Sequence, residues 1–193
     1  MTVRLYLPLY HSEARGVIFS ETTVTGVFLV GFQTMPDQRG FFARSWCQQE
    51  WDRAGLNPRL AQCNVSFNLR RGTLRGMHYQ AAPHAEAKLV RCTRGAIYDV
   101  AVDLRPDSPT FLRWAAAELT ADNRRALYIP EGCAHGFLTL EDNTEVFYQM
   151  SEFYHPEAAR GVRWNDPAFG IEWPAEVKVI SERDRSYPDF VRS

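Results

Sequence analysis

Short apolar runs separated by turn residues make up most of this chain of 193 residues. In residues 96–104, Tyr98, Val100 and Val102 alternate with polar or small residues, a two-residue period that predicts a strand with one apolar face. Similar runs predict further strands at residues 24–32, 88–94, 126–129, 136–140 and 144–150. Many short strands and little helix favour an all-β sandwich or barrel, and among these we predict a jelly roll.

Turn and helix signals lie between the expected strands. Residues 36–40 predict a turn. Residues 45–54 predict a short helix that ends at Gly55. Two hairpins are also expected, 88–94 with 96–104 around Gly95, and 136–140 with 144–150 around Asp142 and Asn143.

The length fits a single domain over residues 1–193. Within it we expect an N-terminal extension at residues 1–23 and a C-terminal tail at residues 175–193 that packs on the barrel. The chain from Tyr154 onward is polar and contains prolines, so we expect it to wrap the barrel in short pieces, with a few short peripheral helices completing the fold.

Composition and charge narrow the classes of function. Hydrophobic residues make up 45% of the chain, which is enough for a substantial core. The net charge is -1, from 22 basic and 23 acidic residues, so no broad basic surface is expected and nucleic-acid binding is disfavoured. A local arginine cluster can still bind a small anion on such a protein.

The cysteines and the start of the chain bear on the compartment. No two of Cys47, Cys63, Cys92 and Cys133 form a C-x-x-C pair, which favours reduced thiols and disfavours structural zinc. Charged residues interrupt the apolar pieces of residues 1–20, so neither a signal peptide nor a membrane span is predicted there. We expect a cytoplasmic protein without a membrane partner.

Two spaced motifs resemble the paired motifs of the cupin superfamily, whose fold is a small jelly-roll barrel. They are Gly72-x5-His78-x-Gln80 with Lys88-x6-Gly95, and Pro130-x-Gly132-x-x-His135. Metal-binding cupins carry a second histidine where this chain has Gln80, and a glutamate where it has Lys88. A lysine ammonium has no lone pair and repels a cation, so no metal is expected in the barrel, which instead suits a substrate oxygen that becomes negative.

Longer strings make the resemblance more specific. In chain order these are Asp37-x-Arg39-Gly40-Phe41-Phe42, Gln62-x-Asn64-x-Ser66, Leu74-Arg75-Gly76-Met77-His78-Tyr79-Gln80, Lys88-Leu89-Val90, Asp99-Val100-Ala101-Val102-Asp103-Leu104-Arg105, Ser108-Pro109-Thr110-Phe111, Ala134-His135-Gly136-Phe137, Trp164-Asn165-Asp166-Pro167 and Ile171-Glu172-Trp173-Pro174. From about Val24 to Asp184 the chain closely resembles the dTDP-4-dehydrorhamnose 3,5-epimerase family.

The resemblance implies a homodimeric isomerase that needs no cofactor and acts on a dTDP-linked 4-keto-6-deoxy sugar inside the barrel. It implies His78 as the base, Asp184 as the carboxylate that orients it, Tyr148 as the acid, and Lys88 as the cation that holds the enolate oxygen. The residues that it implies around the substrate are Arg39, which approaches the diphosphate, Tyr154, which stacks on the nucleobase, and Phe42, Gln62, Asn64, Arg75, Asp99, His135 and Arg183.

These residue types suit the chemistry. Epimerisation beside a ketone removes a proton from one face of the sugar and delivers another to the opposite face. A histidine with an ordinary pKa of about 6.5 can accept the first proton, and a carboxylate on its other nitrogen fixes the tautomer. A tyrosine with an ordinary pKa of about 10 is protonated and can supply the second. A lysine placed in a dry barrel stabilises the enolate between the two steps.

Other interpretations of single residues stay open. Taken alone, His78 could be structural, Tyr148 a core residue, and Lys88 a solvated residue at a sheet edge. Asp184 lies in a charged run that is typical of a surface loop, and Asp166 is a rival carboxylate that we interpret as a turn residue. On an ideal strand Arg75 and His78 would face opposite ways, unless Gly76 marks a bulge.

Alternatives for the function also stay open. Arg44 and Glu86 depart from what many relatives carry at those positions, a glutamate and a glutamine. Such departures leave room for epimerisation at C3 only or C5 only, or for another sugar. The remaining rivals are a related ketoisomerase, a metal-dependent cupin enzyme and a non-catalytic sugar-nucleotide binding module.

Overall fold

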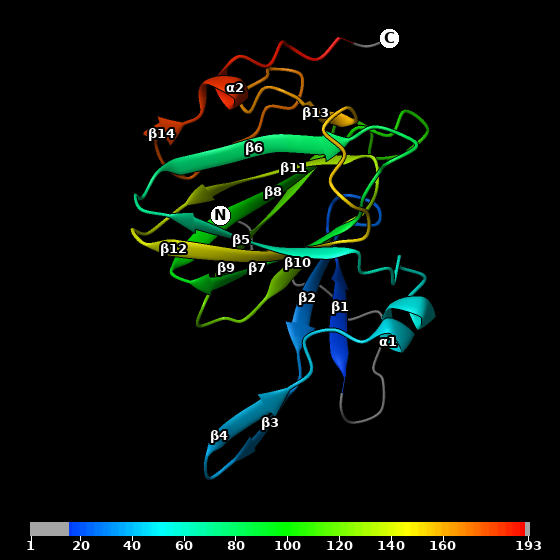
Figure 1. Ribbon diagram of the computed structural model, residues 1–193, viewed down its shortest axis with the longest axis vertical. Coiled ribbons are helices and arrows are strands. Elements are labelled where there is room, and N and C mark those ends of the chain that lie inside the picture. Colours follow the sequence, from blue (N-terminus) through cyan, green and yellow to red (C-terminus); the bar gives the residue numbers. More distant parts are fainter. Residues whose placement is uncertain (1–15, 192–193) are drawn as a thin grey trace.

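Two antiparallel sheets face each other in the computed structural model, which describes residues 16–191 (Figure 1). The first sheet runs in the order β1 (Val17–Glu21), β2 (Phe28–Phe32), β10 (Ala126–Ile129), β7 (Lys88–Arg94), β12 (Thr144–Met150) and β5 (Gln62–Asn68). The second runs in the order β13 (Ala159–Gly161), β6 (Thr73–Gln80), β11 (Cys133–Thr139), β8 (Ala96–Asp103) and β9 (Trp114–Thr120). At its edge β14 (Val179–Ile180) pairs parallel with β6.

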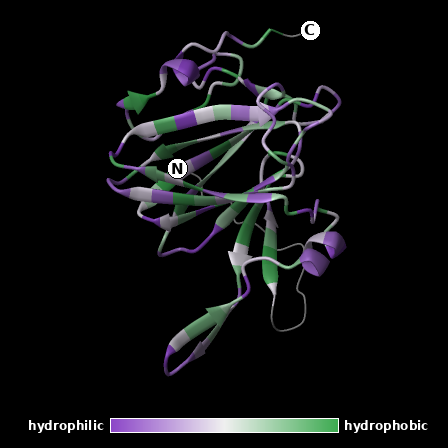
Figure 2. Ribbon diagram, viewed as in Figure 1, coloured by the Kyte–Doolittle hydropathy of each residue, from purple (hydrophilic) through white to green (hydrophobic). Residues whose placement is uncertain are grey.

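Three smaller elements lie outside the two sheets. Strands β3 (Thr34–Asp37) and β4 (Gly40–Ala43) form a separate hairpin that projects from the barrel (Figure 1). Helix α1 (Gln48–Arg53) and helix α2 (Glu182–Arg185) are short and largely hydrophilic (Figure 2). The turn expected at residues 36–40 and the helix expected within 45–54 are therefore present, although the helix is shorter than predicted.

The core between the sheets consists of aliphatic side chains from both. Val90, Leu127 and Val146 of the first sheet join one buried cluster with Ile97 and Leu119 of the second. All five are essentially inaccessible to solvent. Burying one such side chain contributes about 1.5–3 kcal/mol, so this cluster holds the two sheets together.

The alternating strand β8 buries both of its faces, not one. Val100 and Val102, from its apolar face, pack with Val162 and Phe169 of the C-terminal part in a separate cluster. Asp99, from the other face, is completely buried and bonds His135. The apolar face thus lies under the C-terminal segments, and the interior face of the barrel carries the polar side chain. In the C-terminal tail, β14 and α2 both contact β6.

Both predicted hairpins are wrong in their pairing, although their strands exist. β7 and β8 follow each other through Gly95 but belong to different sheets, and β11 and β12 do the same through residues 140–143. Gly95 has φ +76, and a Cβ there would lie 2.5 Å from Thr144 Oγ1. The chain therefore crosses from one sheet to the other at two neighbouring corners, where local turn residues had indicated simple reversals.

The first strands also differ from the expectation. β2 begins at Phe28, because Val24 and Val27 belong to a turn closed by the Val27 N–H to Val24 carbonyl bond of 3.1 Å. β1 pairs with β2, so the sheet begins inside the segment expected to be an N-terminal extension. Residues 1–15 lie outside the described residues. Within residues 16–191, none of the helices has the length and apolar character needed to span a bilayer.

A bulge in β6 decides which of its side chains face the interior. His135 pairs with His78 and Phe137 pairs with Arg75, so three steps along β6 match two steps along β11. The extra residue lets Arg75 and His78 line the same cavity, as the bulge predicted at Gly76 requires. Gly76 has φ +141, and a Cβ there would lie only 2.5 Å from the Cα of Gly136.

We expect Gly76→Ala to lower the free energy of unfolding by about 4 kcal/mol or more, because the methyl group adds a backbone clash to an unfavourable φ. Gly40 is a matched control, since its φ is +130 but nothing lies within 4 Å of a Cβ there. Gly40→Ala should cost only about 1–2 kcal/mol. Urea unfolding of both variants measures the difference, and equal losses would contradict the assigned contact.

Candidate active site

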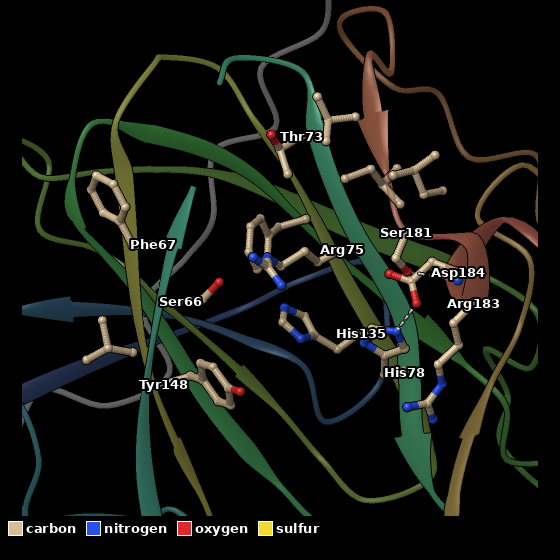
Figure 3. A pocket seen from close by; sticks show the side chains of 15 residues that line it. Ser66, Phe67, Thr73, Arg75, His78, His135, Tyr148, Ser181, Arg183 and Asp184 are labelled. Atoms are coloured by element: carbon tan, nitrogen blue, oxygen red, sulfur yellow. Dashed lines mark hydrogen bonds and ion pairs between the residues drawn. The ribbon is translucent and has the colours of Figure 1, made fainter. Parts of the chain in front are cut away.

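A cavity of about 690 Å³ lies between the two sheets beneath α2 (Figure 3). β6 contributes Arg75 and His78, β11 contributes His135, and β12 contributes Tyr148. A second cavity of about 350 Å³ shares His78, Tyr148 and Arg183 with the first and is also lined by four residues expected at the site. These are Gln62, Asn64, Lys88 and Tyr154. The four residues expected to be catalytic therefore all line one continuous site.

His78 is held by a carboxylate from the C-terminal tail. Its Nε2 lies 2.7 Å from Asp184 Oδ1, and the Gly76 N–H donates to Asp184 Oδ2 at 3.2 Å. Burial on its own raises the pKa of a carboxyl group, but the hydrogen bonds from His78 and Gly76 hold the pKa of Asp184 below its ordinary value. An ionised Asp184 only accepts, so Nε2 carries the proton and Nδ1 is the nitrogen able to take another.

The local fold places Asp184 in this position. Ser181 caps α2, with its side-chain oxygen accepting the Asp184 N–H at 3.1 Å, and Asp184 is only 5% exposed. Asp184 is therefore not a solvated loop residue, although it lies in a charged run of the sequence. The rival carboxylate Asp166 is also buried, but it accepts the N–H groups of Ala168 and Phe190 and so fixes backbone geometry, as the turn interpretation requires.

Tyr148 faces the cavity from the wall opposite His78 (Figure 3). Val146 and Met150 on the same face of β12 are buried, as the strand alternation predicts. Burial raises the pKa of Tyr148 above its ordinary value, and nearby Arg75 opposes this. The phenol is therefore protonated at neutral pH and can act as a proton donor.

A second histidine–carboxylate pair lies deeper. His135 Nε2 is 2.7 Å from Asp99 Oδ1, and Asp99 is completely buried. Burial raises the pKa of Asp99, while His135 and the more distant Lys88 lower it. Asp99 does not line the cavity itself, so it acts on the site through His135.

Lys88 has a buried partner that the sequence interpretation did not include in the site. Its Nζ lies 2.8 Å from Glu86 Oε1 and 3.3 Å from the His78 carbonyl oxygen, and Glu86 Oε2 accepts the Gln80 N–H at 3.0 Å. Lys88 is only 8% exposed, so it is not a solvated residue of a sheet edge. The signal in the sequence was a glutamate two residues before Lys88, although Glu86 itself precedes β7.

The polar side chains of β5 line both cavities. Gln62 and Asn64 line the second, and Ser66, two residues further, lines the first with its Oγ buried and unpaired among residues 16–191. The string Gln62-x-Asn64-x-Ser66 held this signal, because alternate residues share one face of a strand. Arg75 donates to Asn68 Oδ1 at 2.8 Å, which fixes its guanidinium beside them.

The mouth of the site is formed by Tyr154 and Arg183. The Tyr154 N–H donates to Gln62 Oε1 at 2.9 Å, and the residue is 52% exposed. Arg183 lines both cavities and donates from Nε to Tyr187 Oη at 2.9 Å. An exposed ring beside a guanidinium at a cavity mouth suits a nucleotide base with its phosphates.

Arg39 and Phe42, like Asp99, are expected substrate residues that do not line the cavity of this chain. Both lie on the projecting β3–β4 hairpin (Figure 1). The Arg39 side chain is 84% exposed and pairs with Asp37 at 2.6 Å, and Phe42 is 66% exposed. Within one chain they are therefore surface residues.

Comparison with known proteins identifies the family. The family model described as dTDP-4-dehydrorhamnose 3,5-epimerase matches residues 21–192. The chain is 41% identical to the dTDP-4-dehydrorhamnose 3,5-epimerase of Sinorhizobium fredii over 181 residues, 93% of this chain and 92% of that protein. The chain belongs to the dTDP-4-dehydrorhamnose 3,5-epimerase family. The family resemblance stated from the motifs is thus confirmed.

Solved structures of this family share the fold. The dTDP-4-dehydrorhamnose 3,5-epimerase of Bacillus anthracis is 41% identical with a TM-score of 0.86, covering 91% of this chain and 100% of that one. A 3'-monoepimerase of Streptomyces bikiniensis, in complex with dTDP-quinovose, is 34% identical with a TM-score of 0.79, covering 86% and 85%. The predicted all-β cupin jelly roll with short peripheral helices is confirmed.

We expect Glu86→Ala to lower the free energy of unfolding by about 3 kcal/mol, because it leaves the buried Lys88 ammonium unpaired. Glu86→Gln should cost less than half as much, since its amide oxygen still accepts from Lys88. Urea denaturation measures both. Glu172 is exposed, so Glu172→Ala is a control that should change stability by no more than about 0.5 kcal/mol. A Glu86→Ala loss as small as the control would rule out a stabilising pair.

Proposed function

We propose that this protein epimerises C3 and C5 of a dTDP-linked 4-keto-6-deoxy-hexose, the reaction of the family to which it belongs. The observation that carries this proposal is that His78, backed by Asp184, and Tyr148 line one cavity from opposite walls. A base and an acid on opposite sides of a bound sugar ring are what inversion of a carbon centre requires. A dTDP-6-deoxy-D-glucose-3,5-epimerase of Legionella pneumophila, 33% identical with a TM-score of 0.83, was solved in complex with dTDP-4-keto-L-rhamnose.

In the proposed mechanism His78 Nδ1 removes the proton next to the ketone. The electron pair moves onto the carbonyl oxygen, and the Lys88 ammonium stabilises the resulting enolate. Tyr148 then gives its proton to the same carbon from the opposite face, which inverts the centre. Asp184 stabilises the imidazolium formed in the first step. Each proton-transfer group contributes on the order of 10² to 10⁴-fold to the rate.

Incorporation of solvent deuterium tests the proposal. Incubation of the purified protein with dTDP-4-keto-6-deoxyglucose in D2O should place deuterium at C3 and C5 of the product, because the protons added on inversion come from solvent. NMR and mass spectrometry measure the label. Label at one carbon only would indicate a mono-epimerase, and movement of the carbonyl signal would indicate a ketoisomerase.

Three variants separate the assigned roles in the same assay. His78→Asn should abolish deuterium incorporation, since no base remains. Tyr148→Phe should slow formation of the inverted product more than it slows exchange, because the enolate still forms. Lys88→Met should reduce kcat severely and leave dTDP binding largely intact. Near-normal turnover in Lys88→Met would contradict its role at the enolate oxygen.

The second candidate function is inversion of a single centre. The Streptomyces bikiniensis 3'-monoepimerase supports it, because that protein shares the fold at 34% identity. Arg44 is a further departure from the family pattern, because many relatives have a glutamate at its position. Its guanidinium pairs with Glu50 at 2.8 Å. The labelling pattern above distinguishes the two candidates.

We also infer that the protein is a cytoplasmic homodimer. All four cysteines are unpaired thiols, which supports a reducing compartment. Phe41 and Phe42 are exposed on a hairpin that projects from the barrel. Val65 and Phe67 are exposed on the edge strand β5, and Leu69 is exposed directly after it. Apolar side chains in such positions are typical of a subunit interface. In a dimer, Arg39 and Phe42 could approach the cavity of the second subunit.

Light scattering after size-exclusion chromatography should give the mass of two chains. Phe42→Glu should shift the protein toward the monomer and weaken dTDP binding by about tenfold or more, because the hairpin would lose an apolar contact. Arg124 lies beside the hairpin, with its guanidinium 4.8 Å from the Phe41 ring centroid. Arg124→Lys is a milder variant that should change the mass and the dTDP affinity less than Phe42→Glu does. A monomeric wild-type protein with full dTDP affinity would contradict the inference.

A further inference from the structure

Three potential metal ligands gather outside the catalytic cavities. His84 lies in the loop between β6 and β7, and His155 and Glu157 lie between β12 and β13. The rings of His84 and His155 stack with their centroids 3.6 Å apart and their planes 19° apart. His155 Nδ1 is 3.1 Å from Glu157 Oε1, and one ligand atom of each of the three residues lies within 4.8 Å of the others.

The backbone that carries these side chains is fixed. The Gln80 side chain joins both loops, donating from Nε2 to the carbonyls of His84 at 2.9 Å and Phe153 at 3.1 Å, and accepting the His155 N–H at 2.6 Å. Gln80 itself is buried in β6. The two imidazoles are therefore held together by a hydrogen-bonded framework, and their approach is not an accident of two free loops.

The donor set suits a transition-metal cation. Neutral imidazoles and a carboxylate are preferred ligands of Zn²⁺, and three protein ligands leave a fourth position for water. The Glu157 N–H and the His155 ring lower the pKa of Glu157, so it is ionised at neutral pH. Arg160 donates to the backbone carbonyls of Glu157 and Ala159, and the Glu157 carboxylate pairs with His155.

We propose that His84, His155 and Glu157 bind one Zn²⁺ ion at the rim of the substrate cavity. Two rings stacked face to face do not yet aim their nitrogens at one point. Both histidine side chains reach solvent, so they can rotate until the nitrogens converge on an ion at about 2.0–2.1 Å without disturbing packed core.

The proposed metal site lies next to Tyr154 at the mouth of the substrate cavity. His155 follows Tyr154, whose ring lines the cavity mouth, and Gln80 lines the same cavity. A bound ion cross-links the two loops and so restricts the motion of Tyr154. The site is separate from His78, Lys88 and Tyr148, so it is not catalytic and does not depend on the proposed epimerase activity.

Calorimetric titration of ZnCl2 into the full-length, chelator-treated protein tests the proposal. We expect one ion per chain with a Kd on the order of micromolar at pH 7.5. His84→Ala and His155→Ala should each weaken binding by about tenfold or more, and Glu157→Gln by a smaller factor. Binding should also weaken strongly at pH 5.5, because the imidazoles must be deprotonated to coordinate.

Two controls exclude other binding positions. His78→Asn removes a barrel histidine, and Cys63→Ser removes an exposed thiol; both should leave the Zn²⁺ affinity unchanged. Binding that persists in the His84→Ala/His155→Ala double variant, or that is lost in His78→Asn, would overturn the proposal, as would a wild-type Kd weaker than about 1 mM. Deuterium exchange without added metal should be unchanged in His84→Ala, so failure of the metal site is distinguishable from failure of the proposed function.

Discussion

The site depends on the close approach of two glycines. Gly76 in β6 and Gly136 in β11 bring two backbones to a distance that no Cβ permits, since a methyl group on either would lie within about 3 Å of the facing strand. This contact accommodates the bulge that turns Arg75 and His78 to the same side. It also brings the Gly76 N–H to Asp184, so one backbone irregularity positions the histidine and helps to hold its carboxylate.

The polar side chains inside the barrel are arranged in acid–base pairs. Three buried carboxylates, Asp184, Asp99 and Glu86, each contact one basic partner at 2.7–2.8 Å, respectively His78, His135 and Lys88. Buried charges are tolerated only when they are paired, and groups already paired need no solvent to reorganise around a new charge. The interior can therefore accept an enolate because its basic groups are fixed before substrate arrives, which is the property that the proposed chemistry demands.

The sequence predicted the strands and the residues around the cavity better than it predicted how the strands pair. Glycine and asparagine signals at Gly95 and Asn143 correctly marked reversals of the chain. A reversal, however, has the same local signal whether the next strand returns beside the last one or crosses to the opposite sheet. Only the long-range packing of β8 beneath the C-terminal segments decides this, and no local pattern contains it. The pairing of Glu86 with Lys88 is not predictable from strand periodicity, because Glu86 precedes β7.

Gln80 links the barrel interior, where metal-binding cupins hold their ion, to the loops that carry His84 and His155. In the cupin motif it occupies the position of a metal-binding histidine, and an amide oxygen is a weaker ligand for transition metals than an imidazole. Here both ends of its amide are used by the rim, where they hold the loops of His84 and His155. Lys88 stands beside it where a metal-binding cupin has a glutamate, and its ammonium pairs with Glu86. The same substitution that takes a ligand out of the barrel thus organises two imidazoles at its mouth.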